Sequence, residues 1–371
     1  MPKAFYFLII AFGMSAIMGW VIIPRILLIS HKKKLYDIPD YRKIHDTPIP
    51  RLGGISFFPV ITITISLLMA VRYIVGLDII HVPERIVLIE FLCLLTGSCI
   101  LYIVGVGDDL IGIHYRSKFI AQILSALLLV VSGLWLRDLD GFLGINFIRA
   151  RYSIPITLFI VVFLTNAINL IDGVDGLASG LSSLSLIIFG LIFIHQRQLI
   201  YALVAFSTLG VLVPFFIYNV FGNQKHGHKL FMGDTGSLTL GFILSFLALR
   251  ICLTGARHPN ESNLAVVAIS SLIVPAFDVI RVALHRIRKH RSPFLPDRNH
   301  IHHKLLRAGL RKRYVTLAIV SLALFYVILN AFLNKLCNIT ILFAIDFAFY
   351  VLLHLIINHF IRKKEVVPCS L

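Results

Sequence analysis

Two adjacent carboxylates end a long apolar stretch of this chain. Asp108 and Asp109 close the sequence GVGDD. Paired carboxylates next to lipid are costly unless a cation or another partner neutralises them. The pair could therefore bind Mg²⁺ or handle a phosphate, with one carboxylate acting as a base. A solvated helix end, with Asp as its cap, is the structural alternative.

A second polar group follows in the sequence NAINLIDGVDG, residues 166–176. Steps of three place Asn166, Asn169 and Asp172 near one face of a helix, and Asp175 follows. A glycine after each aspartate allows the backbone to approach a ligand closely. Two amides and two carboxylates at the end of an apolar segment suit a metal ion and a hydrogen-bonding sugar or base. A helix end with an Asp-Gly turn is the weaker alternative.

The segment GDTGS, residues 233–237, precedes another apolar stretch. Asp234 could be a third metal carboxylate. Gly236 and Ser237 could present backbone N–H groups to a phosphate. An N-cap at the start of a helix explains the same residues equally well.

The segment PDRNHIHH, residues 296–303, gathers basic and imidazole side chains. Arg298, His300, His302 and His303, together with Lys304, could form an anion pocket. A zinc site is disfavoured because the segment has no cysteine and the carboxylates elsewhere favour a hard, oxygen-preferring ion. A basic loop on an anionic membrane surface remains the alternative.

Two further places could contact substrate. The segment 34–54 contains His45 among bases, prolines and a glycine pair, which favours an ordered loop over a tether, although topology-setting charge is the alternative. Lys118 opens the apolar segment after the Asp pair, where a phosphate contact and a snorkelling anchor are equally compatible with the sequence.

The amino-acid composition indicates the class of protein that holds these residues in place. Of 371 residues, 58% are hydrophobic and 14% are charged, and the mean hydropathy is +0.89. Soluble domains carry roughly 25% charged residues. A disordered protein, a coiled coil and an ordinary soluble enzyme are excluded. The net charge of +17 indicates membrane orientation and anionic lipid contact rather than nucleic-acid binding, because the bases lie between apolar runs.

Eleven apolar runs have spanning or near-spanning length, and none shows the alternation of a membrane barrel strand. We expect an all-α, polytopic membrane protein of about eleven transmembrane helices that forms one integral membrane domain over residues 1–371. The runs are Phe5–Leu28, Ile55–Val75, Ile86–Val106, Phe119–Trp135, Ile154–Ile171, Leu177–Ile194, Leu199–Phe221, Leu238–Leu253, Leu264–Leu284, Tyr314–Leu333 and Ile339–Ile361.

The distribution of Lys and Arg predicts the orientation. With the N-terminus outside, most of the 35 Lys and Arg residues fall on the inner side, and the C-terminus is cytoplasmic. The four main polar groups then meet at the cytoplasmic face. Carboxylates, imidazoles and bases gathered on one face suit phosphoryl-type transfer between a soluble donor and a lipid-borne phosphate. A transporter for an anionic metabolite would instead show internal repeats and charges near the bilayer midplane.

The chain resembles the polyprenyl-phosphate N-acetylhexosamine-1-phosphate transferases of glycosyltransferase family 4. The resemblance extends from Lys34 to about Leu306. Its markers are the RKxHxxPxPRxGG loop (Arg42 to Gly54), the Asp-Asp pair, NxxNxxDGxDG, GDTGS and HIHH. It implies a UDP-N-acetylhexosamine donor, undecaprenyl phosphate as acceptor, UMP as a product, and a requirement for Mg²⁺ or Mn²⁺.

The resemblance also implies roles for individual residues. Asp108 and Asp109 would handle the acceptor phosphate, and Asp234 would bind the metal. Asp172 and Asp175 would complete the catalytic carboxylates, with Asp108 and Asp172 as additional metal ligands. Substrate contacts would come from Lys118, Asn166, Asn169, His45, Arg298, His300, His302 and His303.

The HIHH form resembles the branch that uses UDP-N-acetylglucosamine and begins a cell-surface glycan, such as O-antigen, in the bacterial inner membrane. Donors carrying FucNAc, GalNAc or MurNAc-pentapeptide are the alternatives. Direct attack by the lipid phosphate and a covalent Asp intermediate both remain open, with direct attack favoured because the acceptor is already an anion near pH 7. A homodimer is also compatible with the resemblance.

Overall fold

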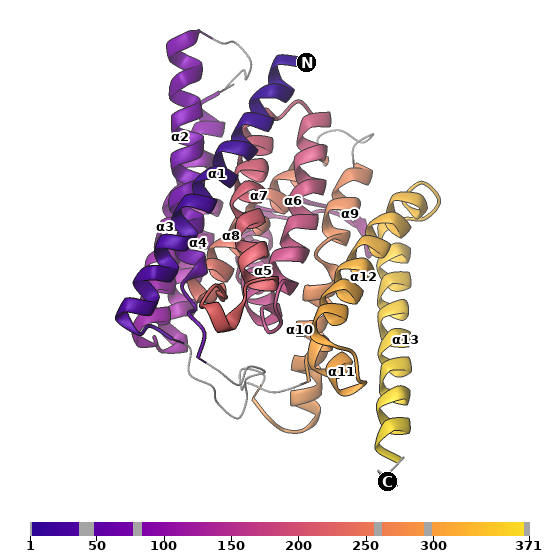
Figure 1. Ribbon diagram of the computed structural model, residues 1–371. Helices are drawn as coiled ribbons and strands as arrows, with labels where there is room; N and C mark the ends of the chain where they lie inside the picture. The colour runs from indigo at the N-terminus through magenta and orange to yellow at the C-terminus, as the bar shows by residue number, and fades with distance from the viewer. Residues whose placement is uncertain (1, 37–47, 77–83, 256–261, 293–298, 367–371) are drawn as a thin grey trace.

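The computed structural model shows a bundle of long helices whose ends collect at two opposite faces (Figure 1). It describes residues 2–36, 48–76, 84–255, 262–292 and 299–366. Successive long helices run in alternating directions. The start of α1 (Pro2–Lys33) and the end of α13 (Ile339–Val366) lie at opposite ends of the bundle (Figure 1).

The remaining helices follow the apolar runs of the sequence. They are α2 (Phe57–Val75), α3 (Glu84–Ile111), α4 (Tyr115–Val131), α5 (Ala150–Ile171), α6 (Leu177–His195), α7 (Leu199–Val220), α8 (Gly233–Gly255), α9 (Ser262–Ser270), α10 (Ile273–Arg288), α11 (Ile301–Arg307) and α12 (Lys312–Leu333), with 3₁₀ turns η1 (Gly53–Ser56) and η2 (Gln224–His226).

The described residues support nine candidate membrane spans, or ten when a bent pair counts as one span, rather than the expected eleven. The bent pair joins α9 to α10 at an angle of 57°. The difference arises at α4, which has 17 residues and is therefore about 26 Å long, against a hydrocarbon core of about 30 Å. The chain is a mostly helical, multi-pass membrane protein.

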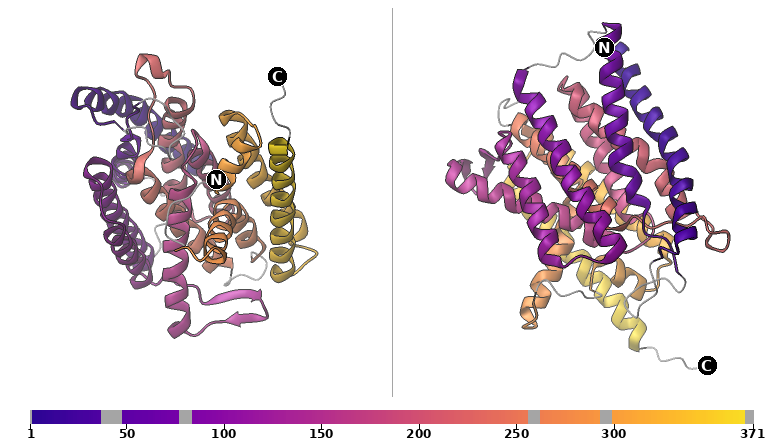
Figure 2. Two further views of the ribbon diagram at one scale, coloured as in Figure 1. Left: turned by 90° about the horizontal axis from the view of Figure 1, so that it is seen from below. Right: turned by 90° about the vertical axis from the view of Figure 1, so that its left-hand side faces the viewer.

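The expectation of an all-α fold is wrong in one place. Strands β1 (Asp138–Phe142) and β2 (Ile145–Phe147) form an antiparallel hairpin between α4 and α5. Gly141 and Gly144 adopt φ of +79° and +76°, which a tight turn requires. The hairpin extends beside the bundle (Figure 2), and Leu143 N–H donates to Thr340 of α13 at 2.7 Å.

Helix α8 lies at the centre of the bundle and is buried along most of its length. It packs against α3, α5, α6 and α9, while α1 packs along α7. Large apolar side chains such as Ile103 and Phe360 remain exposed on the outer helices, as expected of a surface that faces lipid. Helix α8 is therefore packed on several sides, and its first turn lies at the end of the bundle that carries the polar residues.

Candidate metal and phosphate site

Three carboxylates from two separate sequence motifs meet at one end of the bundle. Asp108 and Asp109 end α3, and Asp234 begins α8. Their carboxylate oxygens lie within 4.8 Å of one another, close enough to share a metal ion. Asp234 lies 125 positions after Asp109 in the sequence, so the packing of α3 against α8 creates the cluster.

Lys118 of α4 provides positive charge to this cluster. Its Nζ lies 2.7 Å from Asp108 Oδ2 and 2.6 Å from Asp234 Oδ2. The other oxygen of Asp108 accepts a hydrogen bond from Ile113 N–H at 2.7 Å, which fixes the carboxylate at the turn between α3 and α4. Two hard carboxylate oxygens that already share one cation form a donor set suited to Mg²⁺.

Asp109 makes different contacts. Its Oδ1 accepts from the backbone N–H of Asp234 at 2.9 Å, and its Oδ2 accepts from Thr235 N–H at 3.0 Å and from Thr235 Oγ1 at 2.6 Å. These donors belong to the first turn of α8, whose N–H groups have no partner within the helix. Asp109 therefore caps α8 from α3, and both of its oxygens are engaged.

The two asparagines of the NAINLIDGVDG motif make contacts in different parts of the structure. Asn169 Nδ2 donates to Asp234 Oδ1 at 3.2 Å and to Ser237 Oγ at 2.8 Å, so Asn169 joins the cluster. Asn166 does not, because its side-chain amide exchanges hydrogen bonds with Gln122 of α4 and donates to Val162 O at 2.8 Å.

The two aspartates of the second motif also differ. Asp172 follows α5, and burial together with the negative charges of Asp234, Asp175 and Asp109 raises its pKa to about 7. Its ionisation is therefore coupled to the charge of the acidic cluster. Asp175 forms an ion pair with Lys229 at 2.5 Å, so its carboxylate already has a cationic partner outside the cluster.

Glycines allow the close approach that the cluster requires. A Cβ on Gly105 of α3 would lie 2.4 Å from Thr235 Cα, and one on Gly54 would lie 2.1 Å from Gly236 N. Backbone bonds add to this contact, with Gly54 N–H donating to Met232 O at 2.8 Å. The first loop and α3 are thereby pressed against the start of α8.

The histidine segment reaches the same end of the bundle. A Cβ on Gly173 would lie 2.4 Å from His302 Nε2, so the imidazole lies against the turn that follows Asp172. Burial lowers the pKa of His302 to about 3. Its ring is therefore neutral near pH 7, and it can donate or accept a hydrogen bond but adds no charge to an anion pocket.

The sequence did not reveal every residue that supports the site. Asp278 of α10 forms an ion pair with Arg281 on the same helix and also accepts from His300 Nδ1 at 2.7 Å. Gln122 and Gly105 gave no local signal, because their roles depend on neighbouring helices. His45 and Arg298 lie outside the described residues, so their predicted contacts stay predictions.

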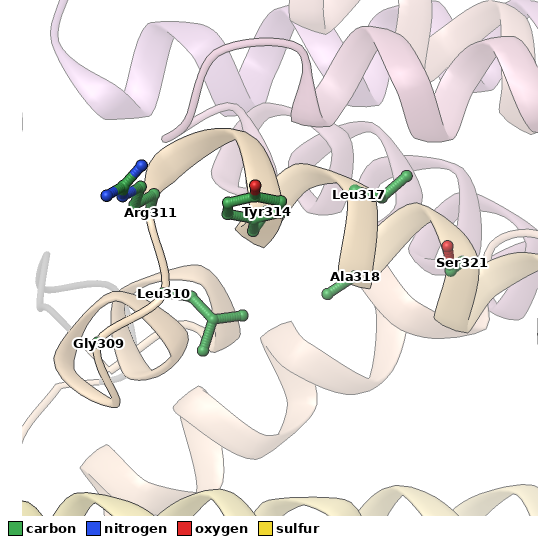
Figure 3. A pocket seen from close by; sticks show the side chains of 7 residues that line it. All are labelled: Gly309, Leu310, Arg311, Tyr314, Leu317, Ala318 and Ser321. Atoms are coloured by element: carbon green, nitrogen blue, oxygen red, sulfur yellow. The ribbon is translucent and has the colours of Figure 1, made fainter.

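Two cavities lie apart from the carboxylate cluster. One, of about 660 Å³, is lined by the turn between α11 and α12 and by the first half of α12, including Arg311 and Tyr314 (Figure 3). The other, of about 380 Å³, is apolar and lies between the hairpin, α5, α8, α9, α10 and α13. Neither is lined by Asp108, Lys118 or Asp234.

Comparison with known proteins identifies the relatives of this chain. Residues 91–252 match the model described as glycosyl transferase family 4, a range that includes α4, Asp108 and Asp234. The undecaprenyl-phosphate alpha-N-acetylglucosaminyl 1-phosphate transferase of Yersinia pestis is 32% identical over 306 residues, which is 81% of this chain and 78% of the relative.

Two other relatives are similarly close. A probable undecaprenyl-phosphate N-acetylglucosaminyl 1-phosphate transferase of Bacillus subtilis (strain 168) is 30% identical over 94% of this chain and 91% of its own length. The undecaprenyl-phosphate alpha-N-acetylglucosaminyl 1-phosphate transferase of Escherichia coli (strain K12) is 31% identical over 80% of this chain and 76% of its own. The chain belongs to glycosyl transferase family 4 and is a membrane-embedded glycosyl-1-phosphate transferase.

Proposed function

We propose that this enzyme transfers N-acetylglucosamine-1-phosphate from UDP-N-acetylglucosamine to undecaprenyl phosphate, giving undecaprenyl-diphospho-N-acetylglucosamine and UMP. The observation that carries this proposal is the carboxylate cluster of Asp108 and Asp234, bridged by the Lys118 ammonium. Relatives whose names specify this reaction match about four-fifths or more of the chain.

We assign Asp108 and Asp234 to hold Mg²⁺ or Mn²⁺, and the charge of Asp234 raises the pKa of Asp172. The fit is supported by the Lys118 ammonium, which binds the same two carboxylates at 2.7 and 2.6 Å and so marks a position where a cation is stable. Once bound, the metal would offset the negative charge that develops on the diphosphate. Lys118 would then pair with the substrate phosphates.

We favour direct transfer in one step. An oxygen of the lipid phosphate forms a bond to the β-phosphorus of the nucleotide sugar. The bond from that phosphorus to the oxygen bridging the two phosphates breaks, and UMP leaves with this oxygen. Asp108 would orient the acceptor phosphate, which needs little activation because it is already an anion. Asn169 holds Asp234 in place through the hydrogen bond at 3.2 Å.

We further propose that the cluster faces the cytoplasm of a bacterial cell, with the start of α1 outside and the end of α13 inside. The last turns of α1 and α10 are basic, with Lys32 and Lys33 in α1 and Arg286 and Arg288 in α10, and this supports the orientation. The relatives of Yersinia pestis and Bacillus subtilis named above are bacterial proteins. One integral membrane domain over residues 1–371 is part of the same proposal, and a homodimer stays a prediction that cross-linking in native membranes would check.

The experiment uses purified protein in detergent with undecaprenyl phosphate and Mg²⁺. Parallel reactions contain UDP-N-acetylglucosamine, UDP-N-acetylgalactosamine or UDP-MurNAc-pentapeptide, and UMP release is followed. We expect release with the first donor. Release with a different donor alone would retain the family chemistry and overturn the assigned sugar.

The variants Asp108→Asn and Asp234→Asn should abolish release. Asp140→Asn is the matched control, because it removes the same charge from a half-buried carboxylate in the hairpin. Equal losses in all three variants would argue against a metal site at the α3–α8 contact.

A further inference from the structure

A buried carboxylate organises the histidine segment. Asp278 of α10 has no solvent exposure. Its Oδ2 lies 2.7 Å from His300 Nδ1, and its Oδ1 accepts from Ile301 N–H at 2.9 Å and from Arg281 at 2.8 Å. One side chain thus fixes both a histidine ring and the first backbone N–H of α11.

The chemistry of this contact sets the state of His300. Asp278 pairs with the guanidinium of Arg281, so its carboxylate is ionised and can only accept hydrogen bonds. Nδ1 of His300 must therefore carry the proton that it donates. The other ring nitrogen, Nε2, is directed away from Asp278. A carboxylate behind an imidazole fixes both its tautomer and its orientation.

His302 lies beside His300 with its ring in the same orientation. The His300 and His302 rings are nearly parallel, at an interplanar angle of 5° and a centroid distance of 5.7 Å. His302 in turn lies against Gly173, next to Asp172. His302 Nδ1 is buried without a hydrogen-bond partner among the described residues. Asp278 therefore lies at the start of a chain of contacts that ends beside the carboxylate cluster.

The last helix completes the arrangement. Tyr350 of α13 donates to Asp278 Oδ1 at 3.3 Å, and Lys304 of α11 donates to Asn358 Oδ1 at 2.9 Å. Tyr350 is almost fully buried. Helix α13 lies outside the range matched by the family model, residues 91–252. It nevertheless contacts both Asp278 and α11, which carries His302 and His303.

We infer that Asp278 is a positioning residue for sugar-nucleotide binding, acting through His300, and that Tyr350 of α13 supports it. This inference rests on the proposed function, because it assigns the histidine segment to the UDP-sugar side of the site. It predicts that changes at Asp278 weaken the use of the donor and leave the use of Mg²⁺ and of the lipid acceptor unchanged.

The test is a double-mutant cycle between Asp278→Asn and His300→Ala. Alone, Asp278→Asn should lower kcat/KM for UDP-N-acetylglucosamine by on the order of 10–100-fold, mainly through KM. In the His300→Ala background the same change should cost less than about twofold, because its target is gone. Equal costs in both backgrounds, or no cost in either, would overturn the inference.

Two further variants keep the test decisive. Tyr350→Phe removes one hydrogen bond without leaving a buried charge, and should lower kcat/KM by on the order of fivefold, again only while His300 is present. If Asp278→Asn does not fold, Tyr350→Phe replaces it in the double-mutant cycle with His300→Ala. Asp346→Asn is the matched control, since Asp346 is also a buried carboxylate bonded to a neighbouring helix, through Asn330 at 2.8 Å. It should leave the donor KM unchanged.

Donor binding is also measured without turnover, by the concentration of UDP-N-acetylglucosamine that raises the Tm. The affinity should weaken in Asp278→Asn but not in Asp346→Asn, and unchanged affinity in a folded Asp278→Asn would contradict the inference. Inactivity of the wild-type enzyme with every donor would contradict the proposed function instead, so the two failures are distinguishable.

Discussion

Asp109 of α3 and Thr235 of α8 are joined by two hydrogen bonds to a single carboxylate oxygen. Oδ2 of Asp109 accepts from Thr235 N–H at 3.0 Å and from its Oγ1 at 2.6 Å. The negative carboxylate also lies at the positive end of the α8 dipole, which is a favourable position for an anion. This contact fixes the start of the central helix α8 against α3. Asp108, the residue before Asp109, remains available to bind a cation.

The first prediction follows from that contact. Asp109→Asn should lower the Tm as well as the activity, because an amide presents one acceptor oxygen where the carboxylate presents two. Thr235→Val should remove the side-chain bond alone and cost about 1.5–3 kcal/mol of stability, the range for a hydrogen bond to a charged group. Thermal melting in detergent checks both. An Asp109→Asn protein with an unchanged Tm and no activity would instead support a role for Asp109 as a base.

The second prediction concerns competition between Lys118 and the metal. Lys118→Met should lower the Mg²⁺ concentration needed for half-maximal thermal stabilisation by on the order of tenfold. Removal of a unit charge near the metal position changes the interaction energy by between about 1 and 4 kcal/mol. Lys229→Met is the control, because Lys229 pairs with Asp175 instead. An Mg²⁺ requirement that rises in Lys118→Met would show that the two cations do not share this position.

The third prediction is a pH dependence from Asp172, whose pKa burial and neighbouring carboxylates raise to about 7. An aspartate in the unfolded chain has a pKa of about 3.9. Asp172 therefore stays protonated to a higher pH in the folded chain than in the unfolded chain. The contribution of this group to the free energy of unfolding is fully present below pH ~4 and is lost as the pH rises through about 7.

The variant Asp172→Asn cannot ionise, so it avoids the loss of stability that ionisation of Asp172 causes at high pH. In EDTA at pH 8 it should melt higher than the wild type by at least about 2–4 °C, the shift expected for about 1 kcal/mol, and at pH 5 the difference should shrink. Asp175→Asn is the comparison with the opposite sign, because it breaks the ion pair with Lys229 and should lower the Tm. A constant difference between the wild type and Asp172→Asn across pH would refute the assigned titration.

The fourth prediction compares two helical glycines. Gly105→Ala should lower both the Tm and the activity, because the new Cβ would lie 2.4 Å from Thr235 Cα and would separate α3 from α8. Gly13→Ala in α1 meets nothing within 4 Å and should be neutral or stabilising by up to about 1 kcal/mol through helix propensity. Similar Tm values for the two variants would mean that the α3–α8 contact tolerates a methyl group.

The sequence predicted the parts of this fold that depend on local pattern. Continuous apolar runs predicted the helices because a lipid-facing or buried helix must satisfy its own backbone. The hairpin was missed because Asp138–Phe142 and Ile145–Phe147 are short and lie between two stronger helical signals. The break between α9 and α10 was missed because the apolar run continues across it.

The sequence predicted which residues belong to the candidate site but not which of them contact one another. Motifs identified Asp108, Asp234 and Asn169, but their partners depend on which helix ends meet. Asn166 matched the same helical face as Asn169, yet Gln122 of α4 engages it instead. Asp278 lies 22 residues from His300, and no local pattern connects them. Such pairings are properties of helix packing rather than of sequence periodicity.

The most direct measurement of the central claim is UMP formation from UDP-N-acetylglucosamine and undecaprenyl phosphate, in Mg²⁺ and in EDTA, by the wild type, Asp108→Asn and Asp234→Asn. The account predicts UMP together with a lipid-linked diphospho-sugar in Mg²⁺ for the wild type alone, and none in EDTA. Undiminished UMP formation in EDTA, or by a folded Asp234→Asn protein, would contradict a metal-dependent site between α3 and α8.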